Sequence, residues 1–185
     1  VYAYPGTPST EITEYIQAHP ITKERGLHCE WSSNEKTAME SALGMSYSGK
    51  RALVCMKHVG MNVMADPLFT VSYIGTNGGL VFCVADDPGM HSSQNEQDSR
   101  HYAIAAKLPM VEPSDSGECL EFTKRAYELS EKFDTPFILR LNTRVSHSQS
   151  IVETSERVEV PVKDYEKNVA KYVMMPANAR GRHVV

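Results

Sequence analysis

The sequence lacks the signature motifs of several common enzyme sites. No G-x-G-x-x-G or G-x4-G-K-[ST] pattern follows a strand-like run, and no G-x-S-x-G pattern occurs. Such patterns bring glycine-rich backbone against phosphate groups, or expose a serine on a tight turn. Their absence leaves a Rossmann dinucleotide site, a P-loop and a serine nucleophile elbow without support.

Cysteine is scarce and dispersed. The four cysteines occupy positions 29, 55, 83 and 119, with no Cys-x-x-Cys pair among them. Because zinc sites and iron–sulfur clusters need clustered thiolates, this chain alone is not expected to hold either. Three of the cysteines lie in strand-like apolar runs, where a reduced thiol behaves as a small buried hydrophobic group. This usage indicates free thiols in a cytoplasmic protein.

Long apolar runs and an excess of basic residues are also missing. No run approaches the roughly 20 residues of a membrane span, and no secretory signal pattern opens the chain at Val1. With a formal net charge of -4, neither a membrane nor a nucleic acid is predicted as a partner. Hydrophobic residues make up 41% and charged residues 23% of the 185 positions, which is typical of one soluble globular domain.

What the sequence does contain is a regular alternation of strand-like and helix-like segments. Apolar runs are followed by segments in which apolar residues recur at helical spacing. Strands joined by helices pair in parallel, which predicts an α/β fold: an open, mostly parallel sheet with helices on both faces. Strands are expected at 1–4, 27–31, 51–58, 78–86, 109–112 and 136–141, and helices ending near His19, Lys50, Tyr73, Lys107 and Phe133.

The C-terminal segment changes character. Residues 164–175 predict a short helix, and residues 176–183 show no core-like periodicity. We interpret 1–150 as one domain and 151–185 as a tail or linker towards a further domain. The basic group at 180–183 is read as a solvated tail rather than a nucleic-acid patch.

Four polar segments follow expected strands. They are Pro5–Ser9, Ser32–Glu35, Lys57–Asn62 and Asp86–Arg100. In open parallel sheets, ligands bind at the carboxyl ends of the strands. The convergence of these segments on that edge predicts a ligand site more strongly than any one of them does.

Glu35 opens the most informative helix. It precedes Ala38 and Met39 by three and four residues, so its carboxylate shares the apolar face. It is therefore either a functional group or part of a helix cap. Ser32 and Ser33 are candidate N-caps, and Ser32-x-x-Glu35 fits a capping box. From the residues alone both interpretations stay open, and the cap is the commoner one.

The 86–101 segment is too rich in hydrogen-bonding groups for core packing, and a loop of this length is usually functional or disordered. Ser92 and Ser93 beside His91 suggest a nucleophile with a base. Sequence neighbours seldom face each other in that geometry, so a hydrogen-bonding loop is favoured. His91 and His101 lack metal-ligand spacing with the nearby aspartates, and no metal site is predicted.

Four segments together resemble one family. They are 4–12 (YPGTPSTEI), 31–40 (WSSNEKTAME), 56–62 (MKHVGMN) and 85–101 (ADDPGMHSSQNEQDSRH). Over essentially its whole length the chain is similar to the 2-oxoacid:ferredoxin oxidoreductases. In particular it resembles the N-terminal thiamine-diphosphate pyrimidine-binding domain of indolepyruvate ferredoxin oxidoreductase alpha subunits.

The resemblance implies roles for individual residues. Glu35 matches the catalytic glutamate that hydrogen-bonds N1′ of the aminopyrimidine and favours the imino tautomer that deprotonates the thiazolium C2. Thr7 matches a residue near both the coenzyme and the substrate carbonyl. The other positions implied to line the coenzyme cleft are Pro8, His58, Gly60 and Asn62, and those implied to face the substrate are His91, Asn95 and Arg100, with Arg100 holding a 2-oxo acid carboxylate bidentately.

The implied reaction is oxidative decarboxylation of an aryl pyruvate such as indolepyruvate to an acyl-CoA, with coenzyme A and ferredoxin. The chain lacks the Gly-Asp-Gly motif that holds Mg2+ and the diphosphate, and the clustered cysteines of a [4Fe-4S] segment. It is therefore expected to be inactive alone, with the rest of the alpha subunit and a beta subunit as partners in an oligomer. The alternative is a non-catalytic α/β binding or interaction domain in which Glu35 is only a helix cap.

Overall fold

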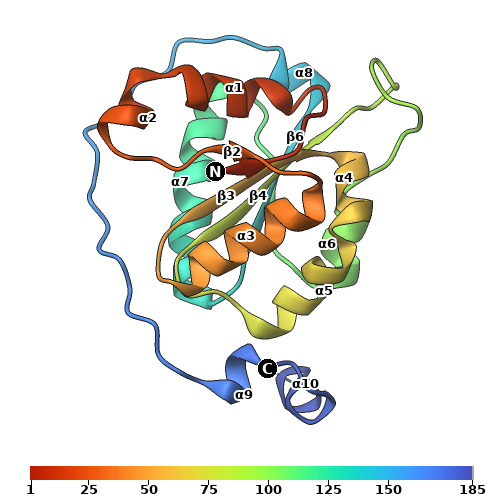
Figure 1. The fold of residues 1–185 in the computed structure, drawn as a ribbon. Helices are drawn as coiled ribbons and strands as arrows, with labels where there is room; N and C mark the ends of the chain where they lie inside the picture. Colours follow the sequence, from red (N-terminus) through yellow and green to blue (C-terminus); the bar gives the residue numbers. More distant parts are fainter. Residues whose placement is uncertain (185) are drawn as a thin grey trace.

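A computed structural model describes residues 1–184, which form a six-stranded sheet with parallel pairing throughout (Figure 1). The order across the sheet is β2-β1-β3-β4-β6-β5. The strands are β1 (Tyr2–Ala3), β2 (Glu30–Trp31), β3 (Ala52–Lys57), β4 (Leu80–Asp86), β5 (Met110–Val111) and β6 (Phe137–Asn142). The predicted parallel α/β fold is confirmed.

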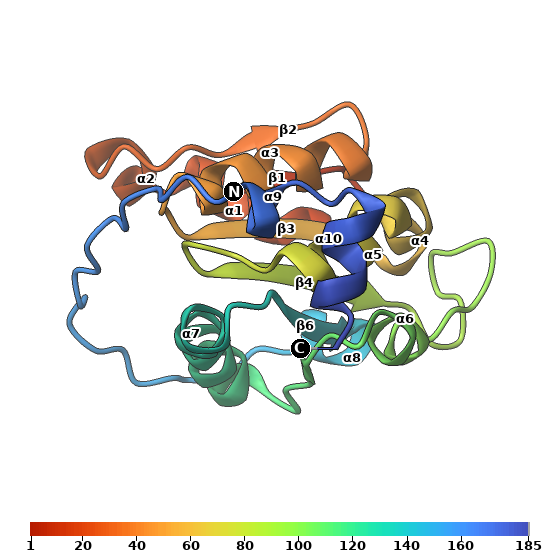
Figure 2. The same ribbon diagram turned by 90° about the horizontal axis from the view of Figure 1, so that it is seen from below.

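Helices cover both faces of the sheet (Figures 1 and 2). One apolar cluster packs α3, α4, α5 and α6 against one face, and a second packs α1, α7 and α8 against the other. No helix within residues 1–184 is long and apolar enough to cross a membrane. The helices are α1 (Thr10–Ala18), α2 (Pro20–Glu24), α3 (Glu35–Tyr47), α4 (His58–Val63), α5 (Ala65–Ile74), α6 (Arg100–Ala106), α7 (Ser116–Phe133), α8 (Thr143–Ser146), α9 (Val169–Tyr172) and α10 (Pro176–Arg182).

The two central strands, β3 and β4, carry most of the core. Their side chains alternate between the two apolar clusters, so that Val54 and Phe82 face one and Cys55 and Cys83 face the other. A strand buried on both faces needs apolar residues at every position, which explains the unbroken apolar runs in the sequence.

The segment Lys57–Asn62 was expected to be a loop before a helix that ends near Tyr73, but it is mostly helical: α4 begins at His58, and α5 follows it. Pro67, in the first turn of α5, has no N–H to donate to the carbonyl of Val63, and its ring would clash with that carbonyl in a continuous helix. The chain therefore breaks at Met64 and restarts. Helix α2 was not expected from the sequence.

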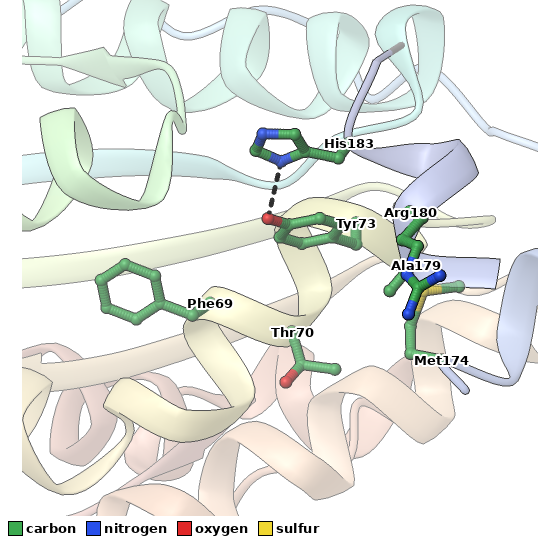
Figure 3. A pocket seen from close by; sticks show the side chains of 7 residues that line it. All are labelled: Phe69, Thr70, Tyr73, Met174, Ala179, Arg180 and His183. Atoms are coloured by element: carbon green, nitrogen blue, oxygen red, sulfur yellow. Dashed lines mark hydrogen bonds between the residues drawn. The ribbon is translucent and has the colours of Figure 1, made fainter. Parts of the chain in front are cut away.

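The C-terminal end is docked rather than solvated, which corrects the expectation for 180–183. Arg182 Nε donates to the Tyr73 carbonyl at 2.8 Å, and His183 Nδ1 lies 2.9 Å from the Tyr73 hydroxyl (Figure 3). Helix α10 is held against α5 by Arg182, which donates to the Tyr73 and Ile74 carbonyls that the C-terminus of α5 leaves free. Arg180 remains exposed.

The linking segment, residues 148–168, contains no helix or strand and runs along the outside of the domain (Figure 1). It nevertheless contacts the domain at several points, including Lys124 with Ser155, Asn77 with the Asp164 carbonyl, and Gly49 with Lys163. Gly49 has φ +87°, and a Cβ there would lie 1.8 Å from the Lys163 carbonyl oxygen, so only glycine permits this contact. The division into a domain and a tail at residue 150 stays a prediction.

Candidate functional site

Loops from three strands meet at the carboxyl edge of the sheet. A Cβ on Gly6 would lie 2.9 Å from Lys57 Cβ, so the loop after β1 passes directly over the end of β3. Lys57 Nζ donates to the Ser92 carbonyl at 2.7 Å, and Ser92 Oγ lies 3.5 Å from the Thr7 carbonyl oxygen. The helix after β1 covers one face of the sheet and the helix after β3 covers the other, so the strand order reverses here, which is where open parallel sheets bind ligands.

Glu35 is the first residue of α3 and is 7% exposed. The N-cap is Asn34: its side chain accepts from the Thr37 N–H at 2.9 Å, and Thr37 Oγ1 accepts from the Asn34 N–H at 3.3 Å. The predicted capping box between Ser32 and Glu35 is therefore wrong. Asn34 takes this role because its backbone is the last extended one before the helix, and the cap interpretation of Glu35 loses its basis.

The environment of Glu35 favours its protonated form. Burial raises the pKa of the Glu35 carboxyl, and its own backbone N–H offsets only part of this shift. A carboxyl group with a raised pKa can stay protonated in a poorly solvated cleft and give a proton to a bound base.

Gly60 packs against Glu35, and His58 begins the same helix, α4, two residues before Gly60. A Cβ on Gly60 would lie 2.7 Å from both Cγ and Oε1 of Glu35, so the absence of a side chain lets α4 approach the carboxylate. His58 is 1% exposed, and its Nε2 lies 3.2 Å from the Asn95 carbonyl oxygen. We call Glu35, His58 and Gly60 the Glu35 wall.

The other residues predicted to line the coenzyme cleft differ in exposure. Thr7 is exposed and Pro8 buried in the loop after β1, where they are joined by a cis peptide bond. Asn62 is exposed on α4, and its Oδ1 accepts from the Tyr102 hydroxyl. Asn62 is thus tied to α6 rather than to the Glu35 wall.

The loop from 87 to 99 projects from the edge of the sheet (Figure 1) and is organised by Asp87. Burial opposes ionisation of Asp87. Hydrogen bonds from Ser93 Oγ, the Ser92 N–H and Thr143 Oγ1 outweigh it and lower the pKa of this carboxyl. His91 and Asn95, predicted to face the substrate, are exposed on this loop.

A second cluster, with a buried centre at Asp86 and Arg140, was not recognised in the sequence. Arg140 Nε donates to Asp86 at 2.8 Å, and Arg140 also binds Glu112. Arg100 donates from Nε and Nη2 to Glu112 at 3.0 and 2.8 Å, and it also pairs with Asp98 at 3.2 Å. We call these five residues the Asp86 cluster. The available signal was a lone arginine in the otherwise apolar β6.

A cavity of about 550 Å³ lies between α5 and α10, away from the Glu35 wall (Figure 3). Its lining is mostly apolar and aromatic. Among residues 1–184, no group of three or more His, Cys, Asp or Glu side chains is placed to hold a metal ion.

Fold and site together define a class: an α/β domain with a buried acid at the carboxyl edge of a parallel sheet. The family described as "Pyruvate flavodoxin/ferredoxin oxidoreductase, thiamine diP-bdg" matches residues 1–183. The chain belongs to this family.

Similar proteins agree with this assignment. "Indolepyruvate oxidoreductase subunit IorA" of Archaeoglobus fulgidus is 48% identical over 185 residues, covering 96% of this chain and 29% of the relative. The protein of the same description from Pyrococcus abyssi is 47% identical, covering 98% and 28%. The chain thus spans less than a third of these relatives.

A solved structure shares the fold. The chain matches a 2-oxoglutarate:ferredoxin oxidoreductase from Magnetococcus marinus with a TM-score of 0.70 and 22% identity. The match covers 78% of this chain and 26% of the other.

Proposed function

We propose that this chain is the pyrimidine-binding domain of a thiamine-diphosphate-dependent 2-oxoacid:ferredoxin oxidoreductase. The observation that carries the proposal is the buried carboxyl of Glu35, with its raised pKa, lying directly against Gly60. Family membership supplies the identity of the coenzyme. No observation favours the non-catalytic alternative, since the capping box on which it depended is formed by other residues.

The residues present fit the aminopyrimidine half of the coenzyme. The wall offers the Glu35 carboxyl, whose pKa is raised, and Gly60, where any Cβ would fill the space beside that carboxyl. It also offers the buried Nδ1 of His58, which has no hydrogen-bond partner among residues 1–184. When bound, thiamine diphosphate supplies the carbon at which a 2-oxo acid is decarboxylated. Glu35 gives a proton to N1′ of the pyrimidine, and burial keeps that proton available.

The remaining predicted residues are placed around this step. We assign Thr7, Pro8, His58, Gly60 and Asn62 to the coenzyme side. On the substrate side we assign Thr7, His91, Asn95 and Arg100. Arg100 can hold a substrate carboxylate bidentately only after it releases Glu112, because Glu112 already accepts from the same guanidinium N–H groups.

The proposed substrate is an aryl pyruvate such as indolepyruvate, in keeping with the names of the relatives. Coenzyme A and ferredoxin would complete the reaction in the cytoplasm. We infer that Mg2+ and [4Fe-4S] clusters are held by other parts of a multi-subunit oligomer that includes the rest of this subunit and a beta subunit.

The test is turnover by the complete enzyme. We expect Glu35→Gln to lower indolepyruvate-dependent, coenzyme A-dependent reduction of ferredoxin by about 10²-fold or more, the scale of a positioned acid. Glu40→Gln is the matched control, since Glu40 lies on the exposed side of the same helix. Wild-type turnover by the Glu35 variant would refute the proposal.

A further inference from the structure

The two ring nitrogens of His58 have unlike surroundings. Nε2 lies 3.2 Å from the carbonyl oxygen of Asn95. Nδ1 is buried and has no hydrogen-bond partner among residues 1–184. The side chain as a whole is 1% exposed, so bulk water does not supply the missing partner.

The contact with Asn95 fixes what each nitrogen can do. A carbonyl oxygen only accepts, so Nε2 must carry the hydrogen of that bond. In a neutral imidazole, Nδ1 then presents a lone pair and can only accept. A buried acceptor without a donor is unfavourable and uncommon, and a bound ligand is one way in which such an atom is satisfied.

His58 also joins the Glu35 wall to the loop at 87–99. It begins α4, and Gly60, two residues further on, is the residue packed against the Glu35 side chain. The preceding residue, Lys57, donates to the Ser92 carbonyl at 2.7 Å. Consecutive side chains therefore hold two carbonyls of the same loop.

We propose that His58 is a ligand-binding residue. Its Nε2–H holds the loop through Asn95, while Nδ1 accepts a hydrogen bond from an N–H or O–H donor of the molecule bound at the Glu35 wall. This inference rests on the proposed function, which offers two sources of that chemistry. One is the exocyclic amino group of the aminopyrimidine, and the other is the indole N–H of the substrate.

Two substitutions separate the nitrogens. His58→Gln places an amide near the Nε2 position, so it can keep the bond to Asn95 while losing the acceptor at Nδ1. His58→Asn places an amide oxygen near Nδ1, so it keeps an acceptor and loses the reach to the loop. Glu40→Gln is the control, because Glu40 is exposed on α3 and lies outside the site.

The experiment measures coenzyme affinity by calorimetry, and KM, in the complete enzyme. We expect His58→Gln to weaken one interaction about tenfold, the effect of one hydrogen bond, with His58→Asn and Glu40→Gln within about twofold of wild type. If the amino group is the donor, thiamine diphosphate binds more weakly to His58→Gln, but oxythiamine diphosphate, with oxygen in its place, does not. If the indole N–H is the donor, KM rises for indolepyruvate and not for phenylpyruvate.

Two results overturn the inference. The first is a His58→Gln enzyme whose coenzyme affinity and KM equal those of the wild type. The second is a His58→Asn enzyme whose loss of affinity, or rise in KM, equals that of His58→Gln. The wild-type protein gives a check that needs no variant, because it must bind thiamine diphosphate about tenfold more tightly than oxythiamine diphosphate or prefer indolepyruvate to phenylpyruvate by a similar factor in KM. If the wild type does not bind thiamine diphosphate at all, the proposed function and this inference are refuted together. If the wild type binds it and His58→Gln behaves like the wild type, only this inference is refuted.

Discussion

Two clusters with buried polar side chains at their centres lie at the carboxyl edge of the sheet, and their polar atoms are satisfied in different ways. In the Asp86 cluster, Arg140 is bonded to Asp86 and Glu112, and the Ser99 N–H donates to Asp86 at 3.0 Å. Arg100 closes the cluster from outside by binding Glu112. Every charged group in it has a partner within the chain.

The Glu35 wall is incomplete by comparison. The capping box of α3 is formed by Asn34 and Thr37 rather than Glu35, and His58 Nδ1 has no hydrogen-bond partner among residues 1–184. Buried polar groups are normally paired, because an unpaired one costs the full desolvation penalty. A completed cluster therefore points to stabilisation of the fold, and an incomplete one at the same edge points to a ligand.

The largest expected effect comes from breaking the completed cluster. Arg140→Met leaves Asp86, which is 0% exposed, without its cationic partner. Removing one member of a buried pair costs about 3–5 kcal/mol, so denaturant unfolding should show a loss of that size. Arg125→Met, at an exposed pair on α7, should cost less than about 1 kcal/mol. Equal effects from the two substitutions would remove the distinction between buried and exposed pairs.

A methyl group at Gly60 should disturb the incomplete cluster. Gly60→Ala places Cβ 2.7 Å from Glu35 Cγ, and overpacking of this kind costs about 1–3 kcal/mol. Gly44→Ala is the control: no atom lies within 4 Å of its added Cβ, and alanine should stabilise α3 by about 0.5–1 kcal/mol. Thermal unfolding measures both changes. If Gly60→Ala stabilised the protein as well, the close packing against Glu35 would be contradicted.

The smallest effect concerns the stability cost of Glu35 itself. Because burial raises its folded-state pKa, ionisation favours the unfolded chain, and stability is lost as the pH rises from the unfolded pKa, about 4.3, through the folded one. Glu35→Gln does not ionise and should be the more stable protein at pH 7, by about 1.4 kcal/mol for each unit of pKa shift. The difference in unfolding free energy between the two proteins should grow from pH 4 to 7. A constant difference would mean that Glu35 titrates normally.

The fold was predictable because its signals are local and repeated. Unbroken apolar runs such as that of β4 identify strands buried on both faces, and the phase of Glu35 with Ala38 and Met39 identified its burial. The cap was not predictable, because Ser32, Ser33 and Asn34 are all good N-cap residues. Only the backbone conformation at 34 decides among them.

The features missed from the sequence depend on contacts between distant residues. Arg140 and Asp86 lie on neighbouring strands and are 54 residues apart in the sequence, and no local sequence pattern predicts that they pair. The docking of α10 depends in the same way on carbonyls at the end of α5. His58 was assigned by resemblance, but its orphaned nitrogen is visible only once the fold brings the loop at Asn95 onto Nε2.

The most direct test of the central claim is hydrogen–deuterium exchange at the thiazolium C2 of thiamine diphosphate bound to the complete enzyme. We predict that Glu35→Gln slows this exchange by about 10²-fold or more while the coenzyme remains bound. An unchanged exchange rate in the Glu35→Gln enzyme would show that this carboxyl does not activate the coenzyme, and would contradict the account.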